Sequence, residues 1–260
     1  TRTPPTALFQ PGEVIDKRFE VVRLLGAGGM GQVFVVKHVH LDRVLALKVL
    51  LPDLHAAPGV HERFRREALA ASKLRHDNVV EVHDSGILAD GTPYYTMELL
   101  EGEDLAATLA REGPLPWARV RKLSLHICRA IVLAHERGVI HRDIKPANCF
   151  RMTRDGDPDH IKVLDFGIAK LVEKDSEVQT RTGGVLGTPH YMSPEQAQGF
   201  KDLGGAADIW SMGVLMYECL AGMRPFEAES MPALLLQICT FDPLPLAERA
   251  ATVHPAFARV

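Results

Sequence analysis

The sequence lacks the features of several large protein classes. Its four cysteines are far apart and no histidine lies near them at a metal-ligand spacing, so we expect free thiols in a reducing compartment. The net charge of −3 offers no basic surface for nucleic acid. The longest apolar run, residues 209–221, is too short to span a bilayer and contains Glu218. Without a secretory signal at its start, the segment is predicted to be cytoplasmic with no membrane contact, although a parent protein could be anchored elsewhere.

The first hundred residues have the periodicity of strands. Residues 19–50 are rich in Val, Leu and Phe and are broken at the glycine-rich 26–31 and at Asp42-Arg43, which predicts three antiparallel strands. Apolar alternation stops at residues 98–102, which indicates a linker. A helix is expected at residues 59–74 and two further strands at 79–83 and 94–97, and these complete a small lobe.

Beyond the linker the pattern is mainly helical. An apolar stripe runs through residues 116–137 and stops at Gly138, the residue type expected just past a helix end. Ser193, Pro194 and Gln196 have the chemistry of a helix start. A short strand is expected at residues 161–164, followed by a long polar loop at 165–187. Two more helices are expected at residues 208–221 and 231–239.

Residues 141–148 place an Asp, a Lys and an Asn within six positions directly after the long helix. Asp143 can orient a hydroxyl, Lys145 can neutralise phosphate and Asn148 can hold a metal, and these are the tasks of phosphoryl transfer. Asp165 follows a predicted buried strand. Together with Asn148 it offers the hard oxygen ligands that magnesium prefers.

The glycine-rich residues 26–31 match G-x-G-x-x-G, a pattern in which backbone amides can approach phosphate closely. Because residues 32–36 continue as a strand, a phosphate-covering hairpin is favoured over a dinucleotide fold, whose fingerprint opens a helix. Lys48 lies inside an apolar strand, where alternation puts it on one face with Ala46, and its ammonium there needs an anion. Glu67 falls on the apolar stripe of the predicted helix and is paired with Lys48. The alternative for Lys48 is a solvent-facing charge on an edge strand. The alternative for Glu67 is a solvated position at the border of the apolar stripe.

Five motifs in this order resemble those of the protein kinase superfamily: glycine loop, strand Lys, helix Glu, His-Arg-Asp loop and Asp-Phe-Gly. Ser-Pro-Glu-Gln-Ala at residues 193–197 resembles the bacterial, Hanks-type serine/threonine branch. The resemblance covers about residues 19–226. It implies an α+β, two-lobed kinase fold, with an antiparallel-sheet N-lobe carrying one main helix, a hinge and a mostly helical C-lobe. These parts correspond to residues 12–98, 99–102 and 103–260.

The resemblance also implies a nucleotide site for ATP. Its residues cover the phosphates, contact them or surround the adenine: Gly26, Ala27, Gly28, Gly31, Val33, Ala46, Lys48, Met97, Glu98 and Leu100. The implied catalytic residues are Lys48, Glu67, Asp143 and Lys145. The implied ligands of magnesium, for which manganese could substitute, are Asn148 and Asp165. Asp208 is similar to the aspartate that holds the catalytic-loop backbone in this family.

Two features imply serine or threonine as the acceptor. Lys145 stands two residues after Asp143, as in serine/threonine kinases. Thr188, in a Gly-Thr-Pro segment, resembles a residue that contacts Asp143 and Lys145 and positions the substrate. The implied partners are therefore ATP and proteins with Ser or Thr acceptors, and nucleic acid is not expected.

Arg142, directly before the catalytic aspartate, indicates control by phosphorylation. A phosphate on the long loop could pair with its guanidinium and order the loop. Thr180 and Thr182 are the candidate sites by position, and the alternative is that they are ordinary polar loop residues. Autophosphorylation in trans would involve a transient homodimer.

The predicted function is an ATP-dependent, non-specific serine/threonine protein kinase. A pseudokinase that serves as a scaffold and binds nucleotide or partners is the alternative, and the completeness of the catalytic groups favours the enzyme. The family continues with further helices, one of which brings an Arg to the position of Glu195. Because the chain stops at Val260, we expect an incomplete and less stable C-lobe.

Overall fold

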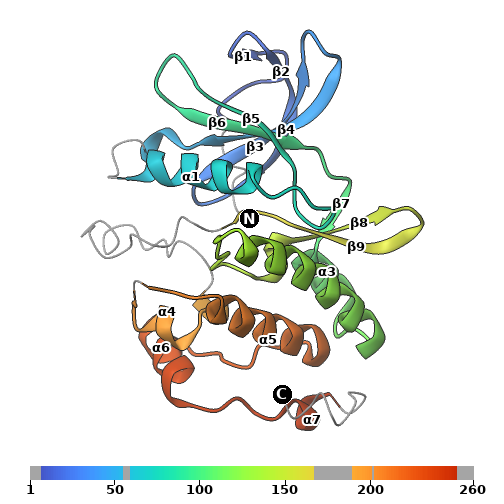
Figure 1. Ribbon diagram of the computed structural model, residues 1–260, viewed down its shortest axis with the longest axis vertical. Coiled ribbons are helices and arrows are strands. Elements are labelled where there is room, and N and C mark those ends of the chain that lie inside the picture. The colour runs from blue at the N-terminus through green and yellow to red at the C-terminus, as the bar shows by residue number, and fades with distance from the viewer. Residues whose placement is uncertain (1–6, 55–58, 167–188, 201, 251–260) are drawn as a thin grey trace. The chain divides into compact units, whose positions relative to one another are not determined.

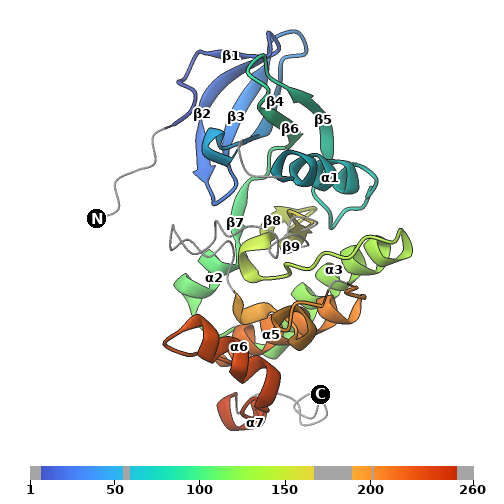
Figure 2. The same cartoon turned by 90° about the vertical axis from the view of Figure 1, so that its left-hand side faces the viewer.

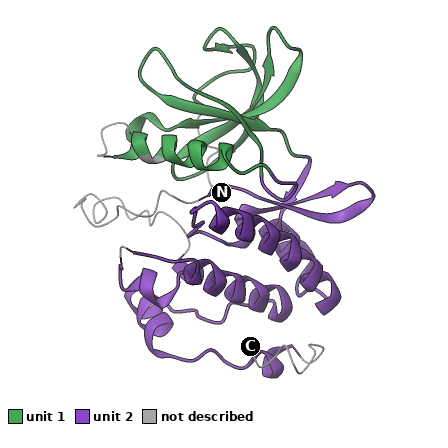
Figure 3. Cartoon of the chain, in the orientation of Figure 1, with its two compact units in different colours: residues 1–75, 80–100, 172–186 green, residues 76–79, 101–171, 187–260 purple. Residues whose placement is uncertain are grey.

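The computed structural model describes residues 7–54, 59–166, 189–200 and 202–250, which form two compact units (Figures 1 and 3). Among the described residues, unit 1 holds 7–54, 59–75 and 80–100, and unit 2 holds 76–79, 101–166, 189–200 and 202–250. No helix in these ranges combines the length and apolar character needed to cross a bilayer.

Unit 1 is an antiparallel sheet with one main helix. The strand order is β1-β2-β3-β4-β6-β5, and every neighbouring pair is antiparallel. The strands are β1 (Val14–Ile15), β2 (Phe19–Ala27), β3 (Gly31–His38), β4 (Arg43–Leu50), β5 (Val82–Ile87) and β6 (Pro93–Glu98). The helical segments are the short η1 (Pro52–Leu54) and α1 (Val60–Ser72). The three predicted strands between residues 19 and 50 and the predicted helix are confirmed.

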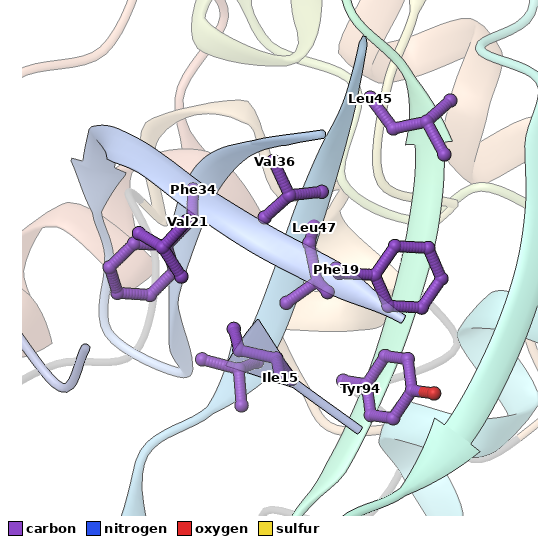
Figure 4. Close-up of a cluster of buried hydrophobic side chains, with 9 residues drawn as sticks. Ile15, Phe19, Val21, Phe34, Val36, Leu45, Leu47 and Tyr94 are labelled. Carbon is purple, nitrogen blue, oxygen red and sulfur yellow. The ribbon is translucent and has the colours of Figure 1, made fainter. Parts of the chain in front are cut away.

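One face of this sheet packs into an apolar cluster (Figure 4). Its buried members include Phe19, Phe34, Leu47 and Tyr94, which come from strands far apart in the sequence. Removing a Phe or Leu side chain of this size from water contributes about 1.5–3 kcal/mol. The period-2 alternation of β3 and β4 therefore fixes which residues remain for the opposite face of the sheet.

The predicted strand at residues 79–83 is wrong in its bounds, since β5 begins at Val82. Val79 forms a parallel bridge with Val163 in unit 2, and its N–H donates to the carbonyl of His76. Both Val79 and Val80 are buried. Val79 and Val80 are therefore apolar because they are buried, although neither belongs to a strand of the sheet in unit 1.

Unit 2 combines a small sheet with helices (Figures 1 and 2). The sheet has the order β7-β8-β9, formed by β7 (Gly102–Asp104), β8 (Cys149–Arg154) and β9 (Asp157–Val163). The α-helices are α2 (Leu105–Glu112), α3 (Trp117–Glu136), α4 (Pro194–Ala197), α5 (Ala206–Ala221), α6 (Met231–Thr240) and α7 (Leu246–Arg249). Two short turns are η2 (Pro146–Asn148) and η5 (Pro189–Tyr191). In both views α3 and α5 lie side by side.

Helix ends in unit 2 follow local chemistry. The residue after the α3 C-cap is Gly138, with φ +72°, and α5 ends at Gly222, with φ +71°. Ser193 and Gln196 form the predicted capping box of α4. Helix α2 was not predicted as a separate element. Asp104 caps it by accepting a hydrogen bond from the N–H of Ala107 at 2.8 Å.

Candidate active site

In unit 1, Lys48 and Glu67 form the predicted ion pair. Lys48 lies on β4 and Glu67 on α1, with 2.9 Å between Lys48 Nζ and Glu67 Oε1. Their side chains are only 12% and 5% exposed. Tyr95 on β6 donates its hydroxyl to the same carboxylate oxygen at 2.9 Å. Since a buried charge is costly without a partner, this arrangement holds an ammonium on an otherwise apolar sheet face.

The glycine-rich hairpin joins β2 to β3, and its glycines differ in their surroundings. A Cβ on Gly31 would lie 2.4 Å from the carbonyl oxygen of Val49, so packing against β4 requires glycine there. A Cβ on Gly26 would meet nothing within 4 Å, and one on Gly28 would meet only the Gly31 oxygen at 4.0 Å. Neither has the positive φ that demands glycine. Packing within the fold therefore requires glycine at Gly31, whereas the backbone at Gly26 and Gly28 has open space beside it.

The expected adenine-contacting residues share one sheet face in unit 1. Val33 is the register partner of Lys48, and Met97 is the register partner of Ala46. Ala46 and Lys48 are two residues apart on β4, so all four side chains are on the same face. Ala27 ends β2 next to the hairpin.

The predicted hinge begins where β6 ends. The backbone N–H of Glu98 donates to the carbonyl of Glu81 at 3.0 Å. Leu100 follows in an irregular segment and is the last residue of unit 1. Gly102, counted in the predicted hinge, instead begins β7, where a Cβ would lie 2.1 Å from the carbonyl oxygen of Arg151.

In unit 2, three of the predicted catalytic-loop residues meet at one carboxylate. Lys145 Nζ lies 2.7 Å and Asn148 Nδ2 lies 3.0 Å from Oδ2 of Asp143. Asn148 Nδ2 also donates to the carbonyl of Asp143 at 2.8 Å. Because both acceptors can only receive hydrogen bonds, the amide nitrogen of Asn148 faces Asp143 and its oxygen faces the other way.

The catalytic loop is held through its backbone by Asp208 of α5, as expected from the resemblance. This carboxylate is 0% exposed. It accepts the backbone N–H of His141 at 2.9 Å and that of Arg142 at 2.7 Å. The Nε2 of His135 lies 2.8 Å from it. These bonds hold Arg142 with φ +65°, a strained value for a residue other than glycine.

His141 connects the loop to the end of β9. Its Nε2 donates to the carbonyl of Leu164 at 2.9 Å, and its Nδ1 accepts the N–H of Asp143 at 3.2 Å. Burial lowers the pKa of His141, which matches a neutral ring with one donor and one acceptor. The ring centroid lies 4.7 Å from that of Phe166, within the Asp-Phe-Gly motif.

The two predicted metal-ligating residues are neighbours in unit 2. The N–H of Leu164 donates to the carbonyl of Asn148 at 2.8 Å, which fixes the start of the Asp165 segment beside the catalytic loop. Asp165 has φ +45°. The amide oxygen of Asn148, which is turned away from Asp143, and the carboxylate of Asp165 are the hard donors that fit a divalent cation.

The predicted regulatory residues are only partly described. The Nε of Arg142 is buried and has no hydrogen-bond partner among the described residues, and burial lowers the pKa of its guanidinium. Its carbonyl accepts from Gln196 Nε2 at 2.9 Å. Thr180, Thr182 and Thr188 lie outside the described residues.

Three supporting residues escaped the sequence reasoning. Tyr95 could have been found by extending the strand register from Lys48 to β6. Gln196 was interpreted only as part of a helix cap, although its amide also reaches the catalytic loop. His135 gave no signal, because its contact with Asp208 joins residues 73 positions apart.

A family model described as Protein kinase domain matches residues 19–245. The chain belongs to the protein kinase family. This kinase domain is 41% identical over its whole length to Serine/threonine-protein kinase pkn3 of Myxococcus xanthus, and covers 48% of that protein. It is 38% identical to the Probable serine/threonine-protein kinase PknB of Corynebacterium glutamicum, over 94% of this chain and 38% of that protein. The domain thus spans less than half of either relative.

Solved structures agree with this assignment. The crystal structure of the Mycobacterium tuberculosis PknI kinase domain matches with a TM-score of 0.72 and 28% identity, covering 97% of this chain and 87% of that chain. The predicted kinase fold and the predicted relation to bacterial serine/threonine kinases are confirmed.

Proposed function

We propose that this domain is an active kinase that transfers the γ-phosphate of ATP to serine and threonine hydroxyls of proteins. One observation carries the proposal: Asp143, Lys145 and Asn148 meet at a single carboxylate oxygen on a loop whose backbone is fixed by Asp208. Such positioned groups supply most of the catalysis in phosphoryl transfer, where the protein does little covalent chemistry.

The reaction needs a carboxylate that can accept the proton of the acceptor hydroxyl, and a cation close to that hydroxyl. Asp143 orients the acceptor hydroxyl and takes its proton as the new oxygen–phosphorus bond forms. The bond between the γ-phosphorus and its bridging oxygen breaks, and ADP leaves with that oxygen. Lys145, 2.7 Å from Asp143, neutralises charge on the transferred phosphoryl group. The names of the bacterial relatives support serine and threonine as acceptors.

Unit 1 supplies the nucleotide-binding residues. Lys48, held by Glu67, contacts the α and β phosphates, and the backbone at Gly26, Ala27 and Gly28 covers them. The support is that nothing in the fold requires glycine at Gly26 or Gly28, so a closely approaching ligand explains them. Gly31 allows the hairpin to pack on β4.

The adenine lies against the sheet face that carries Val33, Ala46 and Met97. Glu98 contributes its carbonyl to the base, because its N–H is already bonded to Glu81. Leu100 contributes backbone in the irregular segment that follows.

Members of the protein kinase family use a divalent metal with ATP, and we assign it here to Asn148 and Asp165. Magnesium is the preferred ion and manganese a substitute, since both take oxygen ligands. When bound, such an ion neutralises charge on the β and γ phosphates. The chain's own part is to present the amide oxygen of Asn148, which its bonds to Asp143 turn outward.

Regulation and substrate positioning are assigned to residues around the catalytic loop. Arg142, whose Nε has no partner among the described residues, receives a phosphate on Thr180 or Thr182. Thr188 positions the acceptor. Autophosphorylation occurs in trans within a transient homodimer. Mass spectrometry after incubation with ATP tests this, and an unmodified loop in an active enzyme would refute it.

The main experiment measures phosphate transfer from magnesium ATP to casein, followed by phosphoamino acid analysis. Wild type should yield phosphoserine and phosphothreonine, and Asp143→Asn and Lys48→Met should lose most of the transfer. Asp155→Asn, the same substitution at an exposed aspartate in the turn between β8 and β9, is the matched control and should behave as wild type. Equal incorporation by all four proteins would refute the mechanism. A wild type that binds ATP without transferring phosphate would indicate a scaffold.

A further inference from the structure

A cluster of metal-ligating side chains lies in unit 2 and is not used by the proposed chemistry. His126 is on α3, and Asp157 and His160 are on β9. Each offers a ligand atom within 4.8 Å of the other two. The two imidazole centroids are 5.1 Å apart. His126 is buried and the other two are half-buried, so the cluster belongs to the packed contact of helix and strand rather than to a solvated surface.

The packing of α3 on β9 places these groups. Arg119, Lys122 and His126 are three and four residues apart, which puts them on one stripe of the helix. Arg119 pairs with Asp159 at 2.8 Å, and Lys122 pairs with Asp157. His126 therefore continues a row of polar contacts from helix to strand.

Hydrogen bonds indicate which ring nitrogens are available to a metal. Nε2 of His160 lies 3.0 Å from the carbonyl oxygen of Asp77, which can only accept, so Nε2 carries the proton. Its Nδ1 then keeps a free lone pair. Nδ1 of His126 accepts the N–H of Ile161 at 3.3 Å, which leaves Nε2 as the second nitrogen of that ring. A histidine whose far nitrogen donates to a carbonyl is the usual arrangement around a bound metal.

We propose that His126, Asp157 and His160 bind one zinc ion that joins α3 to β9. Two imidazoles and one carboxylate suit zinc and related transition metals rather than magnesium or calcium, which prefer oxygen ligands. Zinc bonds of about 2.0–2.2 Å draw the three atoms together through small side-chain rotations. Three protein ligands leave a fourth position for water.

Binding changes two existing contacts. Coordination through Nε2 of His126 moves that proton to Nδ1 and gives up the 3.3 Å bond from Ile161. Lys122 must also release Asp157, and its half-exposed side chain can turn into solvent. Zinc and Lys122 therefore compete for the same carboxylate, which predicts moderate affinity.

The site has a structural consequence for unit 2. Helix α3 precedes the catalytic loop and β9 precedes Asp165, so one ion ties together the elements that lead to both. Because zinc binds this arrangement only when the chain is folded, it should raise the melting temperature.

The test is a zinc titration of the untagged chain against a chromophoric chelator, without nucleotide and with excess magnesium to occupy oxygen-ligand sites. Wild type should bind one equivalent. His160→Gln and Asp157→Asn should each bind at least about tenfold more weakly. His38→Gln, in unit 1, is the control and should bind as wild type. Thermal melts without zinc show whether each variant is folded.

Lys122→Met separates a metal site from a merely structural contact. Loss of the competing cation should tighten zinc binding, whereas damage to the helix–strand packing would weaken it. Absence of saturable binding to wild type, unchanged binding by His160→Gln or weaker binding by Lys122→Met would each overturn the proposal. Kinase activity does not enter this test.

Discussion

In unit 1 the proposed catalytic charges neutralise each other directly, as Lys48 meets Glu67 on the face of a sheet. In unit 2 the proposed catalytic groups depend on a carboxylate that takes no part in the chemistry, because Asp208 holds the loop by its backbone. The first arrangement concerns two side chains, so its loss should reduce stability while the surrounding main chain keeps its hydrogen bonds. The second fixes the main chain, so its loss should affect structure and activity together.

Removing Asp208 should have the largest effect. Asp208→Ala leaves the N–H groups of His141 and Arg142 without their acceptor, at about 1–3 kcal/mol for each buried group. Urea denaturation should show this loss, and phosphate transfer should fall with it. Asp208→Asn keeps one acceptor oxygen and should lose less. Asp202→Ala, at an exposed residue, is the control. If it lowers the free energy of unfolding as much as Asp208→Ala does, the proposed role of Asp208 in holding the backbone is wrong.

Breaking the ion pair of unit 1 should cost less. Lys48→Met leaves Glu67 buried with the hydroxyl of Tyr95, and we expect a loss of about 2–4 kcal/mol, below that of a wholly unpaired charge. The double variant Lys48→Met/Glu67→Leu removes both charges and should recover much of this stability while staying inactive. Stability losses that simply add in the double variant would show that the two residues are not coupled.

Two glycines of the hairpin in unit 1 should respond differently to substitution by alanine. Gly31→Ala forces its Cβ against Val49 and should destabilise the domain by about 1–3 kcal/mol. Gly28→Ala meets open space, so the melting temperature should change little while the KM for ATP rises. Equal melting temperatures for the two variants would contradict the packing role of Gly31.

The smallest effect is expected at Glu103 of β7. Hydrogen bonds from Arg111 first, then Arg151 and Thr108, lower the pKa of this carboxyl from 4.5 to about 2. A lowered folded-state pKa means that its contribution is present above pH 4.5 and disappears as the pH falls towards 2. The stability difference between wild type and Glu103→Gln should therefore shrink over that range. Exposed Glu101→Gln is the control, and a pH-independent difference would contradict this assignment.

Local periodicity explains which parts of this structure were predictable. Strand alternation and the helical stripe were enough to pair Lys48 with Glu67, because each side chain's direction follows from its own element. The strand β5 was misplaced because its sequence, Val-His-Asp-Ser-Gly-Ile, has little apolar alternation, while the two valines before it, Val79 and Val80, are buried outside the strand.

The supports of the catalytic loop were harder to predict. Asp208 was identified through resemblance, and the bond between His141 and the carbonyl of Leu164 was missed. These contacts join a side chain to backbone 67 or 23 positions away. No local pattern records such a pairing, since any polar residue could supply it.

In the proposed function, residues of unit 1 govern nucleotide binding and Asp143 of unit 2 governs phosphate transfer. Measuring ATP affinity and turnover together in Asp143→Asn tests it most directly. We expect ATP affinity to stay within about twofold of wild type while turnover falls by about 10²–10⁴, the usual contribution of a positioned proton acceptor. Turnover near the wild-type rate, or a parallel loss of ATP affinity in a folded protein, would contradict it.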